Sequence, residues 1–268
     1  MALSPAAAIA RTAIGIIGNV ISFFLFLSPV PTFRKVVKWK STREFSGVPY
    51  VVMLFNSLLW VYYGLPIAVQ PNAILVATIN GVGCVLEIVY IATFLFYANS
   101  KERKKMLILL GAVLSLVALI VVLTMVMASR SKRIIIVGIL CVVVNVAMYA
   151  SPLTIMRKVI QAKSVKYMPF SLSFTYFLNG LIWSTYACIG LDKFLLISNG
   201  SGAFLGACQL IIYAKYYGGI HPEDQKDKIK QGIHLGKGGQ KVCGADGDVE
   251  NGATKHDLEI THAFSVET

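Results

Sequence analysis

The sequence predicts an all-α membrane protein: seven transmembrane helices, arranged as two parallel triple-helix bundles (helices 1–3 and 5–7) joined by linker helix 4. Three observations predict this class, namely the composition, the number of long apolar runs and an internal duplication. Hydrophobic residues make up 56% of the 268 residues and charged residues only 14%, whereas a typical soluble domain carries roughly 25% charged residues. Side chains this apolar need lipid as their solvent, which excludes a soluble domain.

Seven apolar runs are each long enough to cross a bilayer, which takes about 20 residues of helix. The runs must be helical, because an isolated segment in lipid has to satisfy its own backbone hydrogen bonds. The expected spans are residues 12–33, 48–69, 73–98, 106–128, 134–156, 169–190 and 194–217.

The positive charges predict the orientation of these spans. The loops after the first, third and fifth runs carry 13 Lys and Arg residues, and the opposite side carries five. Because cytosolic loops are enriched in Lys and Arg, we expect the N-terminus outside and the C-terminus in the cytosol. The net charge of +12 therefore orients helices and does not indicate nucleic acid binding. The plasma membrane is the expected location, with the vacuolar membrane as the alternative.

The last segment, residues 218–268, differs in composition from the rest. It holds six Lys and nine acidic residues and is rich in Gly. Such a segment buries too little apolar surface to fold by itself. We therefore expect a disordered cytosolic tail.

The chain contains two copies of a three-helix unit, expected at residues 1–98 and 134–217, with linker helix 4 and its loops at 99–133. The linker adds one crossing, so both copies face the same way, and in such parallel repeats the ligand lies near the midplane between them. A displacement of 123 residues, or 119 for the last match, aligns Ser28-Pro29 with Ser151-Pro152, Arg34-Lys35-Val36 with Arg157-Lys158-Val159, Asn56 with Asn179, Trp60 with Trp183, Tyr63 with Tyr186, and Asn80-Gly81 with Asn199-Gly200.

These motifs resemble those of the plant SWEET bidirectional sugar transporters over nearly all of residues 9–217. The resemblance implies facilitative transport of a small sugar, in contact with membrane lipid, by a homo- or hetero-oligomer such as a trimer. The sequence shows no metal-ligand spacing, phosphate loop or nucleophile elbow, so we expect no catalytic residue, metal or cofactor. The resemblance rests on Phe26-Leu27-Ser28-Pro29, Phe45-Ser46-Gly47-Val48-Pro49-Tyr50, Tyr63-Gly64-Leu65-Pro66, Thr78-Ile79-Asn80-Gly81, Met148-Tyr149-Ala150-Ser151-Pro152-Leu153, Lys163-Ser164-Val165, Met168-Pro169-Phe170 and Asn199-Gly200.

The resemblance also implies a cytosolic gate of four prolines, Pro29, Pro49, Pro152 and Pro169. Proline removes a backbone hydrogen bond and clashes with the preceding turn, so it sets a point at which a helix bends. The alternative is that these prolines only start or end helices, since two of them begin their apolar runs.

Two repeat-related pairs are candidates for binding the sugar. Asn80 and Asn199 offer amide donors and acceptors that suit hydroxyl groups, and facing lipid would be costly for them. The alternative for this pair is hydrogen bonding between helices. Trp60 and Trp183 offer an indole face for a sugar ring and an N–H donor. Their position well inside the runs argues against the alternative, an interfacial aromatic belt.

The resemblance implies a size filter as well, at Leu25, Asn56, Met148 and Asn179. These residues are larger than those of sucrose-moving relatives, which favours a hexose over a disaccharide. At the outer side the pair Tyr63 and Asp192 resembles the extracellular gate of the family. The alternative for this pair is an exposed loop acid beside a tyrosine that reaches the interface.

Glu87 is the one clear acid within the spans, and a proton-driven pump usually needs a relay of ionisable groups. We expect Glu87 to face the bundle as a hydrogen-bond partner, and we expect a bidirectional, low-affinity uniporter that works by alternating access.

Three alternatives stay open: a sucrose carrier, a PQ-loop amino-acid exporter of the same plan, and a seven-helix receptor. The duplication disfavours the receptor. The exporters carry Pro-Gln at the bend, where this chain has Pro-Leu, Pro-Phe or Pro-Tyr.

Overall fold

The computed structural model describes residues 3–43, 45–66, 68–70, 72–166 and 168–218. The chain divides into two units, Met1–Ile220 and His221–Thr268, and the described residues all belong to the first. The predicted cytosolic tail lies outside the described residues from position 219 onward. All regular secondary structure in the described part is helical.

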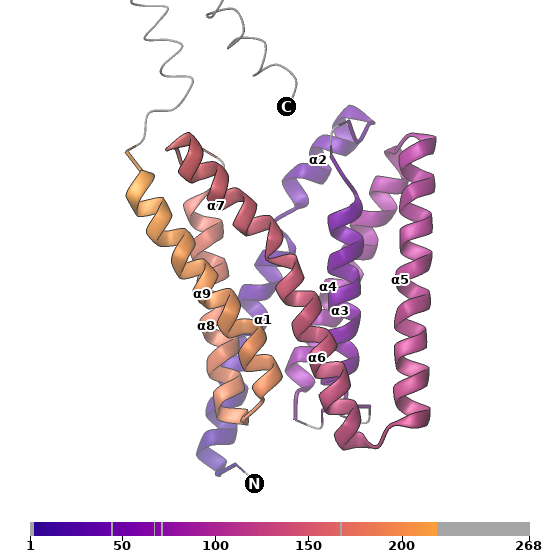
Figure 1. Cartoon of the computed structure of the whole chain (residues 1–268), viewed down its shortest axis with the longest axis vertical. Helices are drawn as coiled ribbons and strands as arrows, with labels where there is room; N and C mark the ends of the chain where they lie inside the picture. Colours follow the sequence, from indigo (N-terminus) through magenta and orange to yellow (C-terminus); the bar gives the residue numbers. More distant parts are fainter. Residues whose placement is uncertain (1–2, 44, 67, 71, 167, 219–268) are drawn as a thin grey trace, which may run out of the picture. The chain divides into compact units, whose positions relative to one another are not determined.

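Nine helices in the described part form seven spanning segments, which confirms the predicted number of spans (Figure 1). The first segment consists of α1 and α2, the fifth of α6 and α7, and each of the others is a single helix. The helices are α1 Pro5–Phe26, α2 Val30–Trp39, α3 Val48–Gly64, α4 Ile74–Tyr97, α5 Ser100–Met127, α6 Arg130–Met148, α7 Ala150–Ala162, α8 Phe170–Gly190 and α9 Lys193–Tyr216.

Five of these segments are long and apolar enough to cross a membrane by length and composition: Pro5–Trp39, Ile74–Tyr97, Ser100–Met127, Arg130–Ala162 and Lys193–Tyr216. The helix α3 is apolar but has only 17 residues. The helix α8 has 21 residues and includes polar side chains such as Ser173, Asn179 and Ser184.

The two broken segments bend at repeat-related prolines. Pro29 is the N-cap of α2, and Pro152 lies in the first turn of α7. Each proline lacks the N–H that would bond the carbonyl four residues earlier, so the helix is interrupted just before it. The apolar runs predicted that these spans end at residues 33 and 156. That was too early, because the backbone stays helical beyond the apolar run while its charged side chains are exposed.

Both broken segments also end in the same way. The C-caps of α2 and α7 are Lys40 and Lys163, with φ of 52° and 48°. The left-handed conformation commonly ends a helix, although glycine usually occupies it. The duplication seen in the sequence therefore extends to an unusual backbone conformation.

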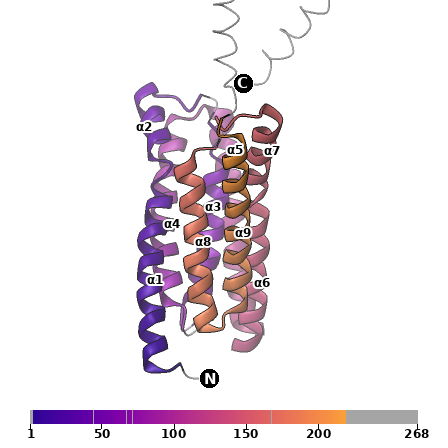
Figure 2. The same cartoon turned by 90° about the vertical axis from the view of Figure 1, so that its left-hand side faces the viewer.

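Helix packing confirms two like-oriented bundles. Within the bundles α3 packs on α4 and α8 on α9, while α1 packs on α4 and α6 on α9. Between the bundles α1 packs on α8 and α6 on α3, so each contact has its repeat-related counterpart. The linker α5 packs mainly on α3 (Figures 1 and 2).

A repeat-related pair of glycines permits close side-chain contacts inside the bundles. A Cβ atom on Gly83 would lie 2.5 Å from the ring of Phe26, and one on Gly202 would lie 2.7 Å from the hydroxyl of Tyr149. Phe26 and Tyr149 are themselves repeat-related, at the ends of the first helix in each broken segment. A side chain at either glycine would push these aromatic rings out of place.

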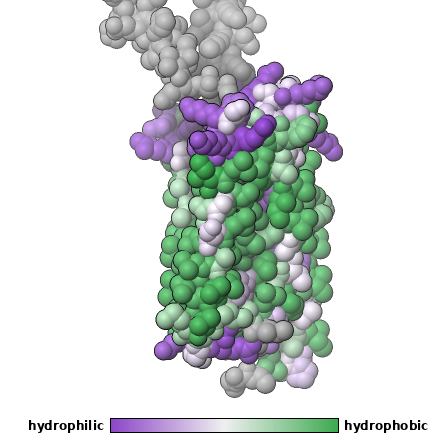
Figure 3. All heavy atoms as spheres, turned by 90° about the vertical axis from the view of Figure 1, so that its right-hand side faces the viewer, coloured by the Kyte–Doolittle hydropathy of each residue, from purple (hydrophilic) through white to green (hydrophobic). Residues whose placement is uncertain are grey.

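The two ends of the bundle differ in charge. The α2–α3, α4–α5 and α7–α8 connections lie at one end, and the start of α1 lies at the other (Figure 1). The first end contains the three Lys- and Arg-rich loops, and we refer to it as the basic end and to the opposite one as the N-terminal end. A hydrophobic band separates two hydrophilic rims (Figure 3), as expected for a protein embedded in a bilayer.

Candidate functional site

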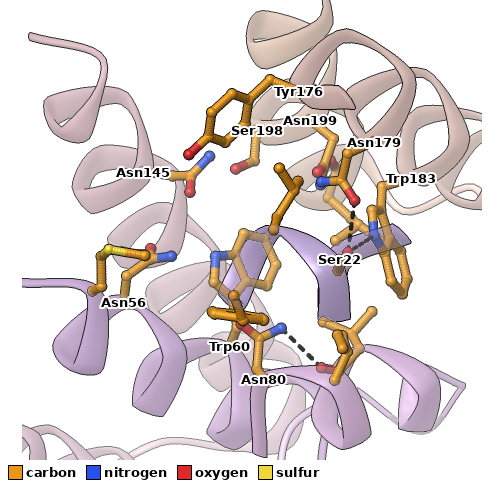
Figure 4. A pocket seen from close by; sticks show the side chains of 16 residues that line it. Ser22, Asn56, Trp60, Asn80, Asn145, Tyr176, Asn179, Trp183, Ser198 and Asn199 are labelled. Atoms are coloured by element: carbon orange, nitrogen blue, oxygen red, sulfur yellow. Dashed lines mark hydrogen bonds between the residues drawn. The ribbon is translucent and has the colours of Figure 1, made fainter. Parts of the chain in front are cut away.

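A cavity of about 200 Å³ lies between the two bundles (Figure 4). Six helices contribute to it: α1, α3 and α4 from the first bundle, and α6, α8 and α9 from the second. Its lining mixes amides, hydroxyls and two indoles with aliphatic side chains. The lining residues are Ser22, Leu25, Phe26, Met53, Asn56, Trp60, Val76, Ile79, Asn80, Asn145, Tyr176, Asn179, Trp183, Leu195, Ser198 and Asn199.

The lining is built almost wholly from repeat-related pairs. All lining residues except Leu25 and Phe26 have their counterpart in the lining, at a spacing of 123 residues or, for α4 and α9, 119 residues. Each bundle therefore contributes half of the cavity. The pairs are Ser22 with Asn145, Met53 with Tyr176, Asn56 with Asn179, Trp60 with Trp183, Val76 with Leu195, Ile79 with Ser198, and Asn80 with Asn199.

Asn80 and Asn199, predicted as the sugar-binding pair, lie opposite one another in this lining. Each amide nitrogen donates to the carbonyl four residues earlier in its own helix, over 2.9 Å to Val76 and 3.0 Å to Leu195. This bond holds the side chain in one orientation. No described residue bonds either amide oxygen, so both acceptors are available to a ligand.

The tryptophans lie inside the bundle and not at its rims. Trp60 and Trp183 are each 4% exposed and line the cavity. Each indole also meets the tyrosine three residues later edge to face, with ring centres 5.4 Å apart for Tyr63 and 5.3 Å for Tyr186. The indoles therefore connect the cavity to the tyrosines at the N-terminal end.

Three of the four predicted size-filter residues, Leu25, Asn56 and Asn179, line the cavity. The fourth, Met148, is not among the lining residues in the described part. The helix α6 ends at Met148, and the chain turns at Tyr149 before Pro152. The turn leaves Asn145, almost one helical turn earlier, as the residue of α6 that reaches the cavity.

Tyr63 and Asp192, predicted as the outer pair, are in contact and buried. The hydroxyl of Tyr63 donates to both carboxylate oxygens of Asp192, over 2.9 and 3.0 Å, and Gln70 donates to one of them over 3.2 Å. Tyr63 is 0% exposed and Asp192 4%, so neither is an exposed loop residue. Asp192 also caps α9 by accepting from the Leu195 N–H. This carboxylate therefore ties the two bundles together at the N-terminal end.

A second contact between the bundles lies at the same end and was missed by sequence reasoning. The guanidinium of Arg11 lies over the ring of Tyr186, the repeat counterpart of Tyr63, and donates to its carbonyl over 3.4 Å. The hydroxyl of Tyr186 donates to the carbonyl of Asn72 over 3.3 Å. Both tyrosines are thus held by a charged side chain from the other bundle.

The four prolines all lie where a helix begins. Pro29 and Pro169 are N-caps of α2 and α8, and Pro49 and Pro152 lie in the first turns of α3 and α7. At two of them the span also bends, as described above. Their role as a gate stays a prediction.

Glu87 faces the inside of the first bundle, as expected, and is fully buried. The expectation that it acts as a hydrogen-bond partner is wrong for the described residues, since neither carboxyl oxygen has a partner there. A buried, unpaired carboxyl group is costly, and apolar spacing alone did not show which neighbours would surround it.

Sequence reasoning also missed four polar or aromatic lining residues: Ser22, Asn145, Tyr176 and Ser198. Ser22 and Asn145 align under the 123-residue displacement and are polar in both copies. Polar residues at matching positions inside two apolar runs could have indicated that both face the cavity. For Tyr176 and Ser198, whose counterparts are Met53 and Ile79, no comparable signal exists.

Two like-oriented triple-helix bundles that enclose a polar, tryptophan-lined cavity define a membrane carrier made from a duplicated unit. A family model described as "Sugar efflux transporter for intercellular exchange" matches residues 12–102 and again residues 135–219. The matches begin 123 residues apart, at the spacing of the internal duplication. The chain belongs to this family, the SWEET bidirectional sugar transporters.

Individual relatives agree with this assignment. The chain is 47% identical to the bidirectional sugar transporter SWEET5 of Arabidopsis thaliana, over 85% of this chain and 97% of that protein. It is 49% identical to SWEET7b of Oryza sativa subsp. japonica, over 81% and 82%. A solved structure of a eukaryotic SWEET transporter superposes with a TM-score of 0.76 at 40% identity, covering 79% of this chain and 99% of that one. These relatives are named as transporters, not as enzymes.

Proposed function

We propose that this protein carries a monosaccharide, such as glucose or another hexose, across a membrane by bidirectional, low-affinity facilitated transport. The observation that carries the proposal is the cavity between the bundles, in which the repeat-related amides of Asn80 and Asn199 present unpaired oxygens beside two indole faces. Amide groups complement hydroxyls, and an indole offers an apolar face with one polar N–H. A sugar ring combines hydroxyls with an apolar face.

The cavity size supports a monosaccharide over sucrose. Its volume of about 200 Å³ is below the roughly 300–1,000 Å³ of pockets that hold drug-sized ligands. The side chains of Leu25, Asn56 and Asn179 occupy part of the lining, and smaller residues there would enlarge it. One ring fits this space more readily than two.

We further propose that transport proceeds by rocking of the first repeat, residues 1–98, against the second, residues 134–217, with residues 99–133 as the linker. Parallel-repeat carriers expose a fixed site alternately to either side in this way. In the proposed cycle the contacts of Tyr63 and Tyr186 hold the N-terminal end closed, and the prolines supply the bends near the basic end. Sugar would then exchange through the basic end.

The charge asymmetry supports an orientation with the N-terminus outside and the basic end in the cytosol. We propose the plasma membrane as the location of the carrier. Assembly into a homo- or hetero-oligomer, such as a trimer, stays a prediction.

Uptake of radiolabelled sugars in cells without endogenous hexose carriers tests the proposal. Glucose, fructose, galactose and sucrose are compared, each with and without a proton uncoupler. We expect saturable hexose uptake that the uncoupler does not abolish. Preferential uptake of sucrose would favour the disaccharide alternative, and loss of uptake with the uncoupler would contradict uniport.

Variants of the cavity complete this test. Asn80→Ala and Trp183→Ala are expected to abolish hexose transport while surface expression stays normal. Normal transport rates in both variants would show that the cavity is not the sugar site.

A further inference from the structure

The two broken segments bend at equivalent prolines but are interrupted over different lengths. Residues 27–29, the first bend, separate α1 from α2, whereas Tyr149 alone, the second bend, separates α6 from α7 (Figure 1). The first turn of α2 also contains another proline, Pro31, whose counterpart in α7 is Thr154. Because each proline removes a backbone donor, the first bend loses more of its helical hydrogen bonds than the second.

One side chain of α4, Tyr90, contacts both arms of the first bend. Its hydroxyl donates over 2.9 Å to the carbonyl of Phe26, the last residue of α1. Its ring stacks on that of Phe33 in α2, with ring centres 4.6 Å apart and ring planes at 15°. Tyr90 is only 4% exposed. Since the two contacts lie on opposite sides of the bend, Tyr90 fixes the angle between α1 and α2.

The carbonyl of Phe26 accepts from Tyr90 because the helix is interrupted there. In a continuous helix this carbonyl would accept from the N–H of Val30, four residues later. That N–H donates instead to the carbonyl of Leu27, over 3.0 Å. The tyrosine hydroxyl therefore replaces a backbone donor, and without it the carbonyl would bear the cost of an unmade hydrogen bond.

The second bend has neither of these contacts. The repeat counterparts of the tyrosine and the phenylalanine are Gln209 and Met156, which cannot stack as two aromatic rings do. The carbonyl of Tyr149 accepts from the N–H of Leu153 over 3.1 Å, as in a regular helix, and needs no donor from a side chain. The angle between α6 and α7 is therefore not fixed from α9 as the first angle is fixed from α4.

The packing around the two arms differs in the same sense. The helix α2 buries two side chains, Phe33 and Val36, whereas α7 buries only Val159. Around Tyr90 the first bundle has an apolar cluster at its basic end, and the described part of the second bundle has no such cluster. Because packed cores resist deformation, α2 is held more firmly than α7. The cluster consists of Phe33, Val51, Leu54, Tyr90, Ile91, Phe94, Ala98 and Met106.

We propose that Tyr90 is a positioning residue of the transport cycle. It braces the first bend, so that α2 moves as a rigid part of the first bundle, and the basic end opens and closes mainly by movement of α7 at the second bend. The two repeats thus differ in mechanism although they share their prolines. This inference rests on the proposed function, because it assigns the movement in a rocking carrier to one of its two bends.

Distances within each bundle test this assignment without any sugar. Spin labels on Lys38→Cys and Ala92→Cys measure α2 against α4, and labels at the repeat-related positions, Gln161→Cys and Ile211→Cys, measure α7 against α9. All four positions are exposed, and the five native cysteines are replaced by serine. By pulsed electron paramagnetic resonance we expect a narrow distance distribution for the first pair and a broad or two-component one for the second. Equal widths would overturn the assignment.

The variant Tyr90→Phe tests the brace itself, because it removes the hydroxyl and keeps the ring that stacks on α2. We expect the first pair of labels to show a second component, populated about fivefold more than in the parent chain. Tyr62→Phe is the matched control, since it also removes one tyrosine hydroxyl bond, of 2.8 Å to Thr124 of the linker, but at neither bend. A first pair that is unchanged in Tyr90→Phe would refute the brace.

Moving the brace to the second repeat gives a test by transport. Gln209→Tyr combined with Met156→Phe should lower the maximal rate of equilibrium exchange about tenfold. The KM should change less than about threefold, because the residues that line the cavity are unaltered. Surface expression and the distances of the second pair identify a variant that fails to fold. A second pair that becomes narrow while the maximal rate stays normal would contradict the role of the second bend.

The two proposals can fail separately. If the unmutated chain carries no monosaccharide, the proposed function is wrong, whereas the label distances still show whether Tyr90 braces the first bend. If the chain carries a hexose but both bends move alike, only the role of Tyr90 is refuted.

Discussion

The guanidinium carbon of Arg11 lies 4.2 Å from the centre of the Tyr186 ring, so a cation on α1 covers an aromatic side chain on α8. Arg11 is only 8% exposed although it lies in the second turn of the first helix. The contact joins the two bundles at the N-terminal end, beside the bond between Tyr63 and Asp192.

Replacing Arg11 by Gln should weaken the proposed closure of the N-terminal end. A partly desolvated cation–π contact is worth about 1–2 kcal/mol, so the open state should become about tenfold more populated. Cys141 is fully buried in the same apolar cluster as Tyr63 and Tyr186. In a chain whose other four cysteines are replaced by serine, we expect an impermeant thiol reagent added at the N-terminal end to label Cys141 about tenfold faster.

Thr12→Ala is the matched control for this experiment. Thr12 follows Arg11 on the same helix but is exposed and bonds only its own backbone. Its labelling rate should equal that of the parent chain. Labelling of Arg11→Gln no faster than the control would contradict a closing role for Arg11.

The carboxylate of Asp192 has two tasks, to cap α9 and to accept from Tyr63. Asp192→Asn keeps the side-chain oxygen that serves both tasks, whereas Asp192→Ala loses both the cap and the partner of Tyr63. Since a helix cap alone contributes about 1 kcal/mol, we expect the alanine variant to lose at least about 1 kcal/mol more unfolding free energy than the asparagine variant. Thermal unfolding of the purified protein measures the difference, and equal midpoints would show that neither contact contributes.

Alanine at Gly83 or Gly202 should destabilise the protein by overpacking. The added methyl group would meet Phe26 or Tyr149 at less than 3 Å, and such insertions typically cost about 1–3 kcal/mol. Gly81→Ala is the control, because nothing lies within 4 Å of a Cβ atom there. Thermal unfolding of the three variants tests this, and the combination of Gly83→Ala with Phe26→Leu should recover part of the loss.

Glu87→Gln tests uniport from within the membrane span. Neither carboxyl oxygen bonds a described residue, so an amide of the same size should change transport by no more than about twofold. A proton-coupled carrier would lose uncoupler-sensitive transport on this change. A loss of transport in Glu87→Gln at normal surface expression would therefore contradict uniport.

Much of the fold was predictable from the sequence, because a segment that crosses lipid must be apolar along almost its whole length. Seven apolar runs and a duplication with Pro, Trp and Asn in register specify seven spans in two like-oriented bundles. The ends of the first and fifth spans were not predictable from apolarity, since helical hydrogen bonds continue where side chains become charged. That Pro29 and Pro152 bend their spans, whereas Pro49 and Pro169 only begin helices, is visible only once the backbone is known.

The site was predictable where both copies carry the same residue. Asn80 with Asn199 and Trp60 with Trp183 lie in the cavity. Met148 is not among the lining residues in the described part, although its repeat counterpart Leu25 is, and the end of α6 at Met148 is not encoded in the spacing along the chain.

Arg11 was overlooked for a different reason. A cation near the start of an apolar run is normally solvated at the interface, and only a ring from the other bundle makes its burial favourable.

The pairwise construction of the cavity has a consequence for how its selectivity can change. All lining residues except two have a repeat counterpart in the lining. A mutation in one copy therefore changes one side of the cavity, and the counterpart keeps the other side unchanged. New preferences for ligands can thus accumulate one half at a time. The selectivity of such a carrier for its ligand therefore depends on the positions at which the two halves differ.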